Sequence, residues 1–202
     1  MGVFLTRILG IDPGIARMGY GVVEVVGSRL QALCFGCIET PPDRTDPQRL
    51  YQIYDELQQP IAAYQPSVMA VEQLFFNRNT TTAFTVGQAR GVALLCGAQA
   101  NLEVVEYTPM QVKLAVTGYG KADKTQVQEM VKLLLGLRSR PRPDDTADAL
   151  AVAITHAHTA ATLVAARDVL AQSSNTDAER ADHGRIVTPL GVRPGTTRRG
   201  TL

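Results

Sequence analysis

The order of its apolar segments is the feature that most limits how this chain of 202 residues can fold. Three strand-like runs come first, over residues 5–12, 18–26 and 29–38, and only Gly27 and Ser28 separate the last two runs. So short a junction predicts a β-hairpin, so the first three strands should be antiparallel. Helix-like and strand-like segments alternate after them. This order is typical of an α/β layered domain with a mixed sheet.

The later segments differ in their hydrophobic periodicity. Residues 47–64 have the apolar spacing of a helix, and short apolar runs at 66–71 and 102–107 predict two further strands. The last apolar run, Ala147–Ala166, is long enough to span a membrane, but it contains an aspartate and two histidines, so we expect a helix packed in the core. Helices are also expected at 80–100, at 110–116, and from a cap at Asp123 to about 135.

The C-terminal residues have a different composition. Apolar periodicity ends near Ala171, and polar residues and then Gly, Pro, Thr and Arg follow. Such a segment has little apolar surface to bury, so we expect one domain over residues 1–166 and a disordered tail over 167–202. The segment before Asp12 is too short for a secretory signal peptide, which predicts a soluble, cytoplasmic protein that does not bind membranes.

Charge is distributed unevenly, although the net charge is only +1. Residues 76–142 hold nine Lys and Arg against four Asp and Glu, whereas residues 1–64 hold five against seven. This balance excludes a uniformly basic, histone-like coat for nucleic acid. It leaves room for a local basic surface in the middle of the chain.

Four carboxylates stand where acidic residues are unusual. Asp12 ends the first apolar strand, Glu72 follows the run at 66–71, and Asp145 and Asp148 share one face at the start of the last helix. Ligands of open α/β sheets bind beyond the carboxyl ends of the strands, so Asp12 and Glu72 should meet there if their strands are neighbours. A cluster of acids needs cations, and a ligand set made only of oxygen suits Mg²⁺ or Mn²⁺. Carboxylates around two such ions are typical of water attack on a phosphodiester.

Each of these acids also has a structural interpretation. Asp144 or Asp145 could cap the last helix, and Asp12 could belong only to a turn with Pro and Gly. Together the four acids favour a metal site, but they do not identify its substrate. His156 and His158 lie more than two helical turns beyond Asp148, so we expect them to serve packing or a partner surface.

Several motifs in register resemble the RuvC family of crossover (Holliday) junction endodeoxyribonucleases, from about Ile8 to His158. The matching stretches are Ile8-Leu-Gly-Ile-Asp-Pro-Gly14 with Gly19-Tyr-Gly21, Glu72-Gln-Leu-Phe75, Gly87-Gln-Ala-Arg-Gly-Val-Ala93, Tyr107-Thr-Pro with Gln111-Val-Lys113, Gly118-Tyr-Gly-Lys-Ala-Asp-Lys124, and Asp145-Thr-Ala-Asp-Ala-Leu-Ala151 leading to Thr155-His-Ala-His158. The resemblance implies a ribonuclease-H-like three-layer fold with a mixed five-stranded sheet flanked by helices. It also implies a homodimer that makes paired, Mg²⁺-dependent nicks with 5′-phosphate ends in four-way DNA junctions during recombination and repair. The RuvA–RuvB branch-migration complex is the implied protein partner.

The resemblance also assigns a role to each acid. The catalytic and metal-binding acids of the family fall on Asp12, Glu72, Asp145 and Asp148; some members have His at position 145, where this chain has Asp. By this assignment Asp12 bridges two Mg²⁺ ions, for which Mn²⁺ can substitute. Glu72 and Asp145 each complete the shell of one ion, and Asp148 is a further ligand or a proton acceptor.

DNA-binding residues are implied in the same way. Lys113 and Lys124 match lysines that the family needs for junction binding and cleavage, and Lys121 is a nearby candidate. Phe75 matches an aromatic residue that stacks on bases near the junction centre. Arg78, in the adjoining loop, is a candidate phosphate contact.

Other functions share some of these features. A ribonuclease-H-like nuclease acting on RNA–DNA hybrids would use the same phosphate chemistry, and a non-catalytic protein could bind DNA of a particular structure. A sugar-kinase or actin-like ATPase also begins with a strand, an Asp-x-Gly turn and a hairpin. That class needs a second similar domain, which 202 residues cannot hold.

Overall fold

An antiparallel hairpin system opens the chain, as predicted. The computed structural model describes residues 5–73 and 80–183. Gly27, between the second and third strands, has a φ of 62°, a left-handed conformation that glycine adopts without steric cost. The three antiparallel strands are β1 (Leu5–Asp12), β2 (Arg17–Val26) and β3 (Arg29–Glu39).

Two parallel strands complete a five-stranded sheet of order β3-β2-β1-β4-β5. These are β4 (Val68–Glu72) and β5 (Glu103–Tyr107). The central strand β1 pairs in parallel with β4, so that Ile11 lies opposite Val71. The carboxyl ends of β1 and β4 therefore lie at the same edge of the sheet, and each end carries an acid. The mixed sheet confirms the predicted fold class.

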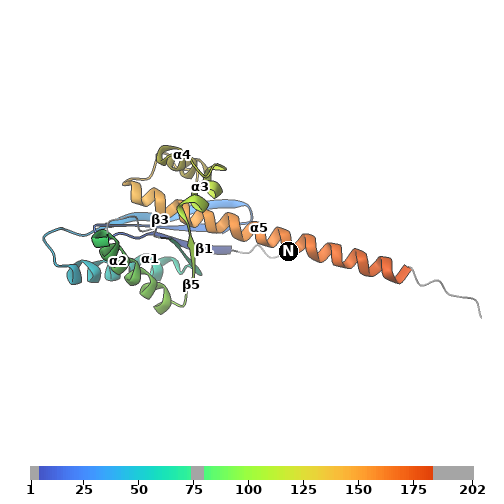
Figure 1. The fold of residues 1–202 in the computed structure, drawn as a ribbon, viewed down its shortest axis with the longest axis horizontal. Helices are drawn as coiled ribbons and strands as arrows, with labels where there is room; N and C mark the ends of the chain where they lie inside the picture. The colour runs from blue at the N-terminus through green and yellow to red at the C-terminus, as the bar shows by residue number, and fades with distance from the viewer. Residues whose placement is uncertain (1–4, 74–79, 184–202) are drawn as a thin grey trace, which may run out of the picture. The chain divides into compact units, whose positions relative to one another are not determined.

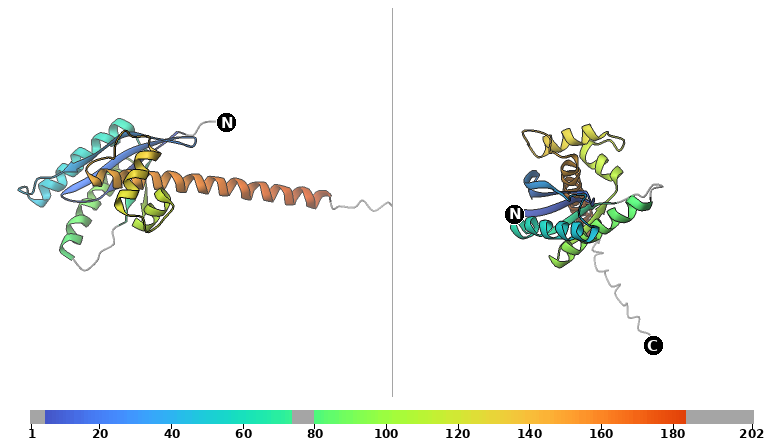
Figure 2. Two further views of the ribbon diagram at one scale, coloured as in Figure 1. Left: turned by 90° about the horizontal axis from the view of Figure 1, so that it is seen from above. Right: turned by 90° about the vertical axis from the view of Figure 1, so that its left-hand side faces the viewer.

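Helices cover both faces of the sheet (Figure 1). Alternate residues of β1 face opposite layers: Ile8 packs in a core cluster with residues of α3, α4 and α5, and Leu9 packs in a second cluster with residues of α1 and α2. The views in Figure 2 show the same division. The helices are α1 (Asp46–Tyr64), α2 (Thr80–Gln99), α3 (Pro109–Thr117), α4 (Lys124–Leu134) and α5 (Asp144–His183).

Local sequence signals set the starts of α3 and α4. In each helix a capping box joins the residue before the helix to the third helical residue: Thr108 with Gln111 in α3, and Asp123 with Gln126 in α4. Gly118 ends α3 in a left-handed conformation. These are the boundaries that the sequence predicts, and they place the short helices beside the carboxyl ends of β4 and β5.

The last helix is longer than expected. The tail over 167–202 was predicted to be disordered, but α5 continues to His183. The prediction relied on the loss of apolar periodicity, but no Gly or Pro ends the helix between 167 and 183. By their contacts the described residues form two units, one ending at Thr162 and the other beginning at Leu163. The functional division after residue 166 stays a prediction.

By length and composition alone, the stretch of α5 from Asp144 to Arg167 could cross a membrane. Core helices of soluble proteins meet the same criterion. Here the residues from Ala149 to Thr155 are all buried, and Leu150 and Ile154 belong to the core cluster on the sheet. The first part of the Ala-rich run is therefore packed in the core, as predicted, whereas residues 161–166 are exposed.

Candidate active site

Two glycines allow the start of α5 to lie directly on the sheet. A Cβ atom added to Gly19 of β2 would overlap the backbone oxygen of Asp145, and one added to Gly10 of β1 would overlap the backbone oxygen of Ala149. Any larger residue at either position would push the helix away from the strands. This close approach brings Asp145 and Asp148 to the edge where β1 and β4 end.

Asp12 has the most strongly perturbed environment of the four acids. Burial raises the pKa of its carboxyl group, and the negative charges of Glu72, Asp148 and Asp145 raise it further, to about 8. Electrostatic effects of this kind act between groups that lie close together. The structure thus brings all four predicted acids into one cluster.

Glu72 and Asp148 also have raised pKa values, for the same reasons as Asp12. Burial raises the pKa of both carboxyl groups, and the charge of Asp148 adds to the effect on Glu72. A hydrogen bond with Asp12 acts on Glu72 in the opposite direction.

Two cationic side chains contact the cluster. Lys124 Nζ lies 3.0 Å from Asp148 Oδ2 and 3.5 Å from Asp144 Oδ2. On the other side, Arg17 Nη1 lies 3.6 Å from Asp145 Oδ2. Lys124 is one of the predicted DNA-binding residues, whereas sequence reasoning missed Arg17. The available signal was the antiparallel pairing of β1 and β2, which places the first residue of β2 beside the end of β1.

A pocket of about 240 Å³ lies beside the acids, and two predicted DNA-binding lysines face it. Lys113 comes from α3 and Lys124 from the start of α4. Lys121 is exposed and does not line this pocket. The predicted DNA contacts Phe75 and Arg78 lie outside the described residues. The lining consists of Glu72, Pro109, Val112, Lys113, Lys124, Val127 and Asp148.

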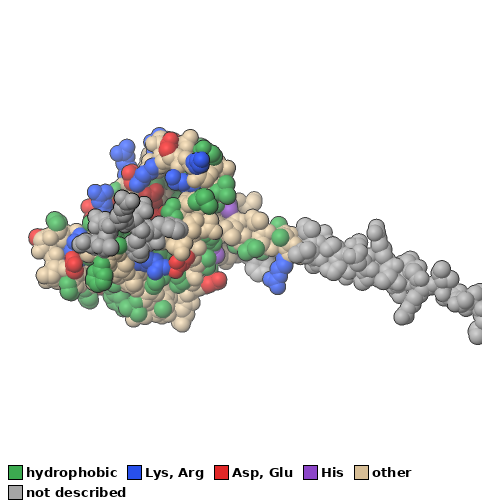
Figure 3. All heavy atoms as spheres, in the orientation of Figure 1, with side chains coloured by type: hydrophobic (Ala, Val, Ile, Leu, Met, Phe, Trp, Pro, Cys, Tyr) green, Lys and Arg blue, Asp and Glu red, His purple; other side chains and the backbone are tan. Residues whose placement is uncertain are grey.

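Basic side chains gather on the upper part of the face shown in Figure 3. Lys and Arg side chains gather there over α3 and α4, and acidic side chains lie among them. These helices belong to the segment 76–142, in which basic residues outnumber acidic ones. Positive charge surrounding a small acidic centre attracts a polyanion and leaves the acids free to bind cations.

The histidines of α5 serve packing, as expected. His156 Nδ1 lies 2.9 Å from the hydroxyl oxygen of Tyr107, and His158 Nδ1 lies 2.9 Å from the backbone oxygen of Ala115. Both contacts tie α5 to neighbouring elements. Oxygen atoms alone therefore make up the donor set of the cluster.

This donor set fits a hard divalent cation. Carboxylate oxygens are the ligands that Mg²⁺ and Mn²⁺ prefer, and the high pKa of Asp12 reflects negative charge that such an ion would neutralise. Within residues 5–73 and 80–183, no three Asp, Glu, His or Cys side chains are already arranged as a metal-binding group. Asp145 and Asp148 instead form ion pairs with Arg17 and Lys124.

Comparison with known sequences identifies the family. The family model described as "Crossover junction endodeoxyribonuclease RuvC" matches residues 8–156. The chain is 60% identical over 151 residues to the protein of that name from Desulfitobacterium hafniense, which covers 75% of this chain and 92% of the relative. It is 58% identical over 160 residues to the protein of that name from Heliobacterium modesticaldum, covering 79% of this chain and 99% of the relative.

Solved structures agree with this comparison. RuvC of Thermus thermophilus matches with a TM-score of 0.73 and 39% identity, over 78% of this chain and 96% of that structure. The same protein in complex with a Holliday junction substrate matches with a TM-score of 0.74 and 40% identity, over 77% and 94%. A yeast mitochondrial Holliday junction resolvase, 16% identical, shares the fold with a TM-score of 0.62. The chain therefore belongs to the RuvC family of crossover junction endodeoxyribonucleases.

Proposed function

We propose that this chain resolves four-way (Holliday) DNA junctions by cutting two opposed strands during recombination and repair. The observation that carries the proposal is the meeting of Asp12, Glu72, Asp145 and Asp148 at one edge of the sheet, in a chain that is 60% identical to a RuvC protein. The match to a structure that holds a Holliday junction substrate supports this substrate over an RNA–DNA hybrid.

The RuvC family is one of metal-dependent nucleases, and we assign the metal site of this chain to the four acids. The ions proposed are two Mg²⁺, for which Mn²⁺ substitutes. Divalent ions at such a site activate the attacking water and stabilise the leaving oxygen of the phosphodiester. In this proposal Asp12, at the end of the central strand, would be shared by both ions, and Glu72 and Asp145 would each be a ligand of one ion. Asp148 is a further ligand or accepts a proton.

The lysines beside the acids bind and orient the substrate. Lys113 and Lys124 line the same pocket as Glu72 and Asp148, so their ammonium groups can contact phosphates next to the bond that is cut. Lys121 would contact DNA farther from the acids. Phe75, as a stacking residue, and Arg78, as a phosphate contact, complete the proposed DNA-binding set.

Paired nicking requires two acidic sites with matching symmetry. A homodimer supplies them, because a two-fold axis relates its two sites as it relates the opposed strands of a four-way junction. The RuvA–RuvB complex is the proposed partner that moves the junction, and the cytoplasm is the proposed location. The products carry 5′-phosphate ends.

Cleavage of a synthetic four-way junction tests the proposed function. The purified chain is incubated with the junction, a linear duplex and an RNA–DNA hybrid, each with and without Mg²⁺. We expect symmetric nicks in the junction alone and only with the metal. Cleavage of the hybrid instead would overturn the resolvase assignment, and binding without cleavage of any substrate would indicate a non-catalytic DNA-binding protein.

A further inference from the structure

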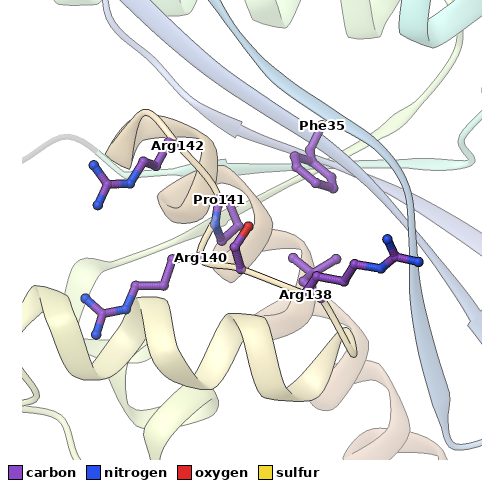
Figure 4. Close-up of a pocket in the computed structure, with 7 residues that line it drawn as sticks. Phe35, Arg138, Arg140, Pro141 and Arg142 are labelled. Atoms are coloured by element: carbon purple, nitrogen blue, oxygen red, sulfur yellow. The ribbon is translucent and has the colours of Figure 1, made fainter.

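A second pocket lies between β3 and the loop that joins α4 to α5 (Figure 4). Its volume is about 570 Å³, and it shares no lining residue with the pocket beside the acids. One wall is an aromatic ring from β3, and the other is a continuous stretch of the loop. The lining residues are Phe35, Leu137, Arg138, Ser139, Arg140, Pro141 and Arg142.

Side chains along this loop separate into inward and outward groups. Leu137 packs against the core cluster beneath α4 and α5, and Pro141 is buried. The three arginines occupy every second position and are all exposed. Figure 4 shows Arg140 and Arg142 extending to one side of the loop and Arg138 to the other. The anchored backbone thus presents three guanidinium groups to solvent.

Most of this positive charge is not neutralised locally. Arg140 forms an ion pair with Glu129 of α4, which ties the loop to that helix. No carboxylate among the residues that the structure describes lies within ion-pair distance of Arg138 or Arg142. Two guanidinium groups are therefore available for an external anion, and the planar guanidinium group matches the oxygens of a phosphate.

The aromatic wall adds a second kind of contact. Phe35 lies on β3 opposite Gly21, and 41% of its surface is exposed. Its ring faces the arginine loop in Figure 4. In that view Arg138 extends on the same side of the loop as the ring, whereas Arg140 and Arg142 extend away from it. Aromatic rings and guanidinium groups are side chains that proteins use to hold the bases and phosphates of nucleic acids.

The position of the loop relates this pocket to the acidic site. Arg142 is followed directly by Pro143 and then by α5, whose first turn carries Asp145. Only two residues separate Arg142 from Asp145 in the chain. The groups around Arg142 are acidic as well as basic, since Asp144 begins the same helix, but Asp144 already contacts Lys124 and Gln128.

We propose that the loop from Arg138 to Arg142, together with Phe35, is a second DNA-binding site, which holds the backbone phosphates of one duplex arm of the junction. The inference rests on the proposed function. It adds to the cleavage site a separate site that binds one duplex arm of the junction. Arg138 and Arg142 make the phosphate contacts, Arg140 fixes the loop on α4, and Phe35 supports the sugar–phosphate chain from the sheet.

Binding measurements on a cleavage-deficient chain test this site. In an Asp12→Asn background, the double substitution Arg138→Gln and Arg142→Gln is compared with the background chain, using a fluorescent four-way junction over a series of salt concentrations. We expect Kd to rise about tenfold at low salt and the slope of log Kd against log salt to fall by about 2, since each phosphate contact contributes about 0.9. Phe35→Leu should raise Kd about threefold without changing the slope, because a stacking contact involves no counterion.

A matched control separates this site from a general loss of charge. Arg29→Gln removes an exposed arginine from the far end of β3, the strand that carries Phe35, and should leave both Kd and slope unchanged. Thermal unfolding verifies that each variant is folded. If the double variant keeps the Kd and the slope of the background chain, or if Arg29→Gln causes an equal loss, the second site is wrong.

Failure of this inference and failure of the proposed function give different results. Wild-type cleavage of the junction with an unchanged Kd in the double variant overturns only the arginine loop as a binding site. Absence of cleavage by the wild type, with a weakened Kd in the double variant, overturns the nuclease assignment and supports the loop as a DNA-binding site.

Discussion

The acidic cluster and the arginine loop lie at the same end of α5, yet they are built in opposite ways. Asp12, Glu72 and Asp148 are partly buried, and burial and neighbouring negative charges raise the pKa of each carboxyl group. The arginines are exposed, and two of them lack an ion-pair partner among the described residues. Crowded, desolvated groups suit chemistry on a bound metal, whereas exposed, permanently charged groups suit binding of a polyanion. We therefore expect that substitutions can alter DNA cleavage and DNA binding separately.

The largest effect is expected for a substitution of Asp12, which should abolish DNA cleavage and leave DNA binding nearly unchanged. Asp12→Asn should reduce junction cleavage more than about a thousandfold, because in the proposed site this carboxylate would hold the ions that stabilise the transition state by several kcal/mol. Junction affinity should change by less than about threefold, because the basic contacts are untouched. Single-turnover cleavage and fluorescence anisotropy measure the two quantities. An equal loss of both would show that Asp12 has a structural role.

The close packing of α5 on the sheet predicts the next largest effect. Gly19→Ala places a methyl group against the backbone oxygen of Asp145, so overpacking should destabilise the fold by about 1–3 kcal/mol and displace the acid. We expect a lower Tm and a loss of cleavage in the folded fraction. Gly91→Ala is the matched control: nothing lies within 4 Å of an added Cβ there, and the site is within α2, so stability should be kept or slightly increased. Similar thermal curves for the two variants would contradict the role of Gly19.

The raised pKa of Asp12 predicts that stability depends on pH when metal is removed. The pKa is about 8 in the folded chain and 3.8 as its ordinary value, so the folded state binds the proton more tightly. The contribution of the protonated Asp12 carboxyl group to the free energy of unfolding is fully present below about pH 4. It is lost as the pH rises toward 8. In EDTA, Tm should therefore fall between pH 5 and pH 8, by about 2–4 °C for each kcal/mol lost. Asp12→Asn should flatten this dependence, and a wild-type curve as flat as that of the variant would contradict it.

The smallest effect is expected at Arg17. Its ion pair with Asp145 is long, at 3.6 Å, and 56% of the arginine side chain is exposed, so the pair contributes about 0.2–1 kcal/mol. Arg17→Gln should slow cleavage about two- to fivefold at saturating metal, and Arg17→Lys should restore most of the rate. A loss of cleavage rate as large as that of Asp12→Asn would indicate that Arg17 is a catalytic residue and not one that positions Asp145.

The sequence alone predicts a large part of this arrangement. Apolar runs that end in Asp12 and Glu72 mark the two strand ends, and Asp123 marks the start of α4. Without the family resemblance, however, nothing local shows that β1 and β4 are neighbours, because their pairing depends on the packing of helices between and around them. The contact of Arg17 with Asp145 was missed for the same reason: it joins β2 to α5, far apart in the chain. The extent of α5 was underestimated because the loss of apolar periodicity does not by itself end a helix, and no Gly or Pro occurs between 167 and 183.

The acids come from segments that are widely separated in the chain: one at the end of β1, one at the end of β4 and two in the first turns of α5. Closing such long loops costs entropy, which only the packed sheet and helices repay. A chain still being synthesised has no α5 and therefore lacks Asp145 and Asp148. The fold thus delays assembly of the four acids until nearly the whole domain has been made.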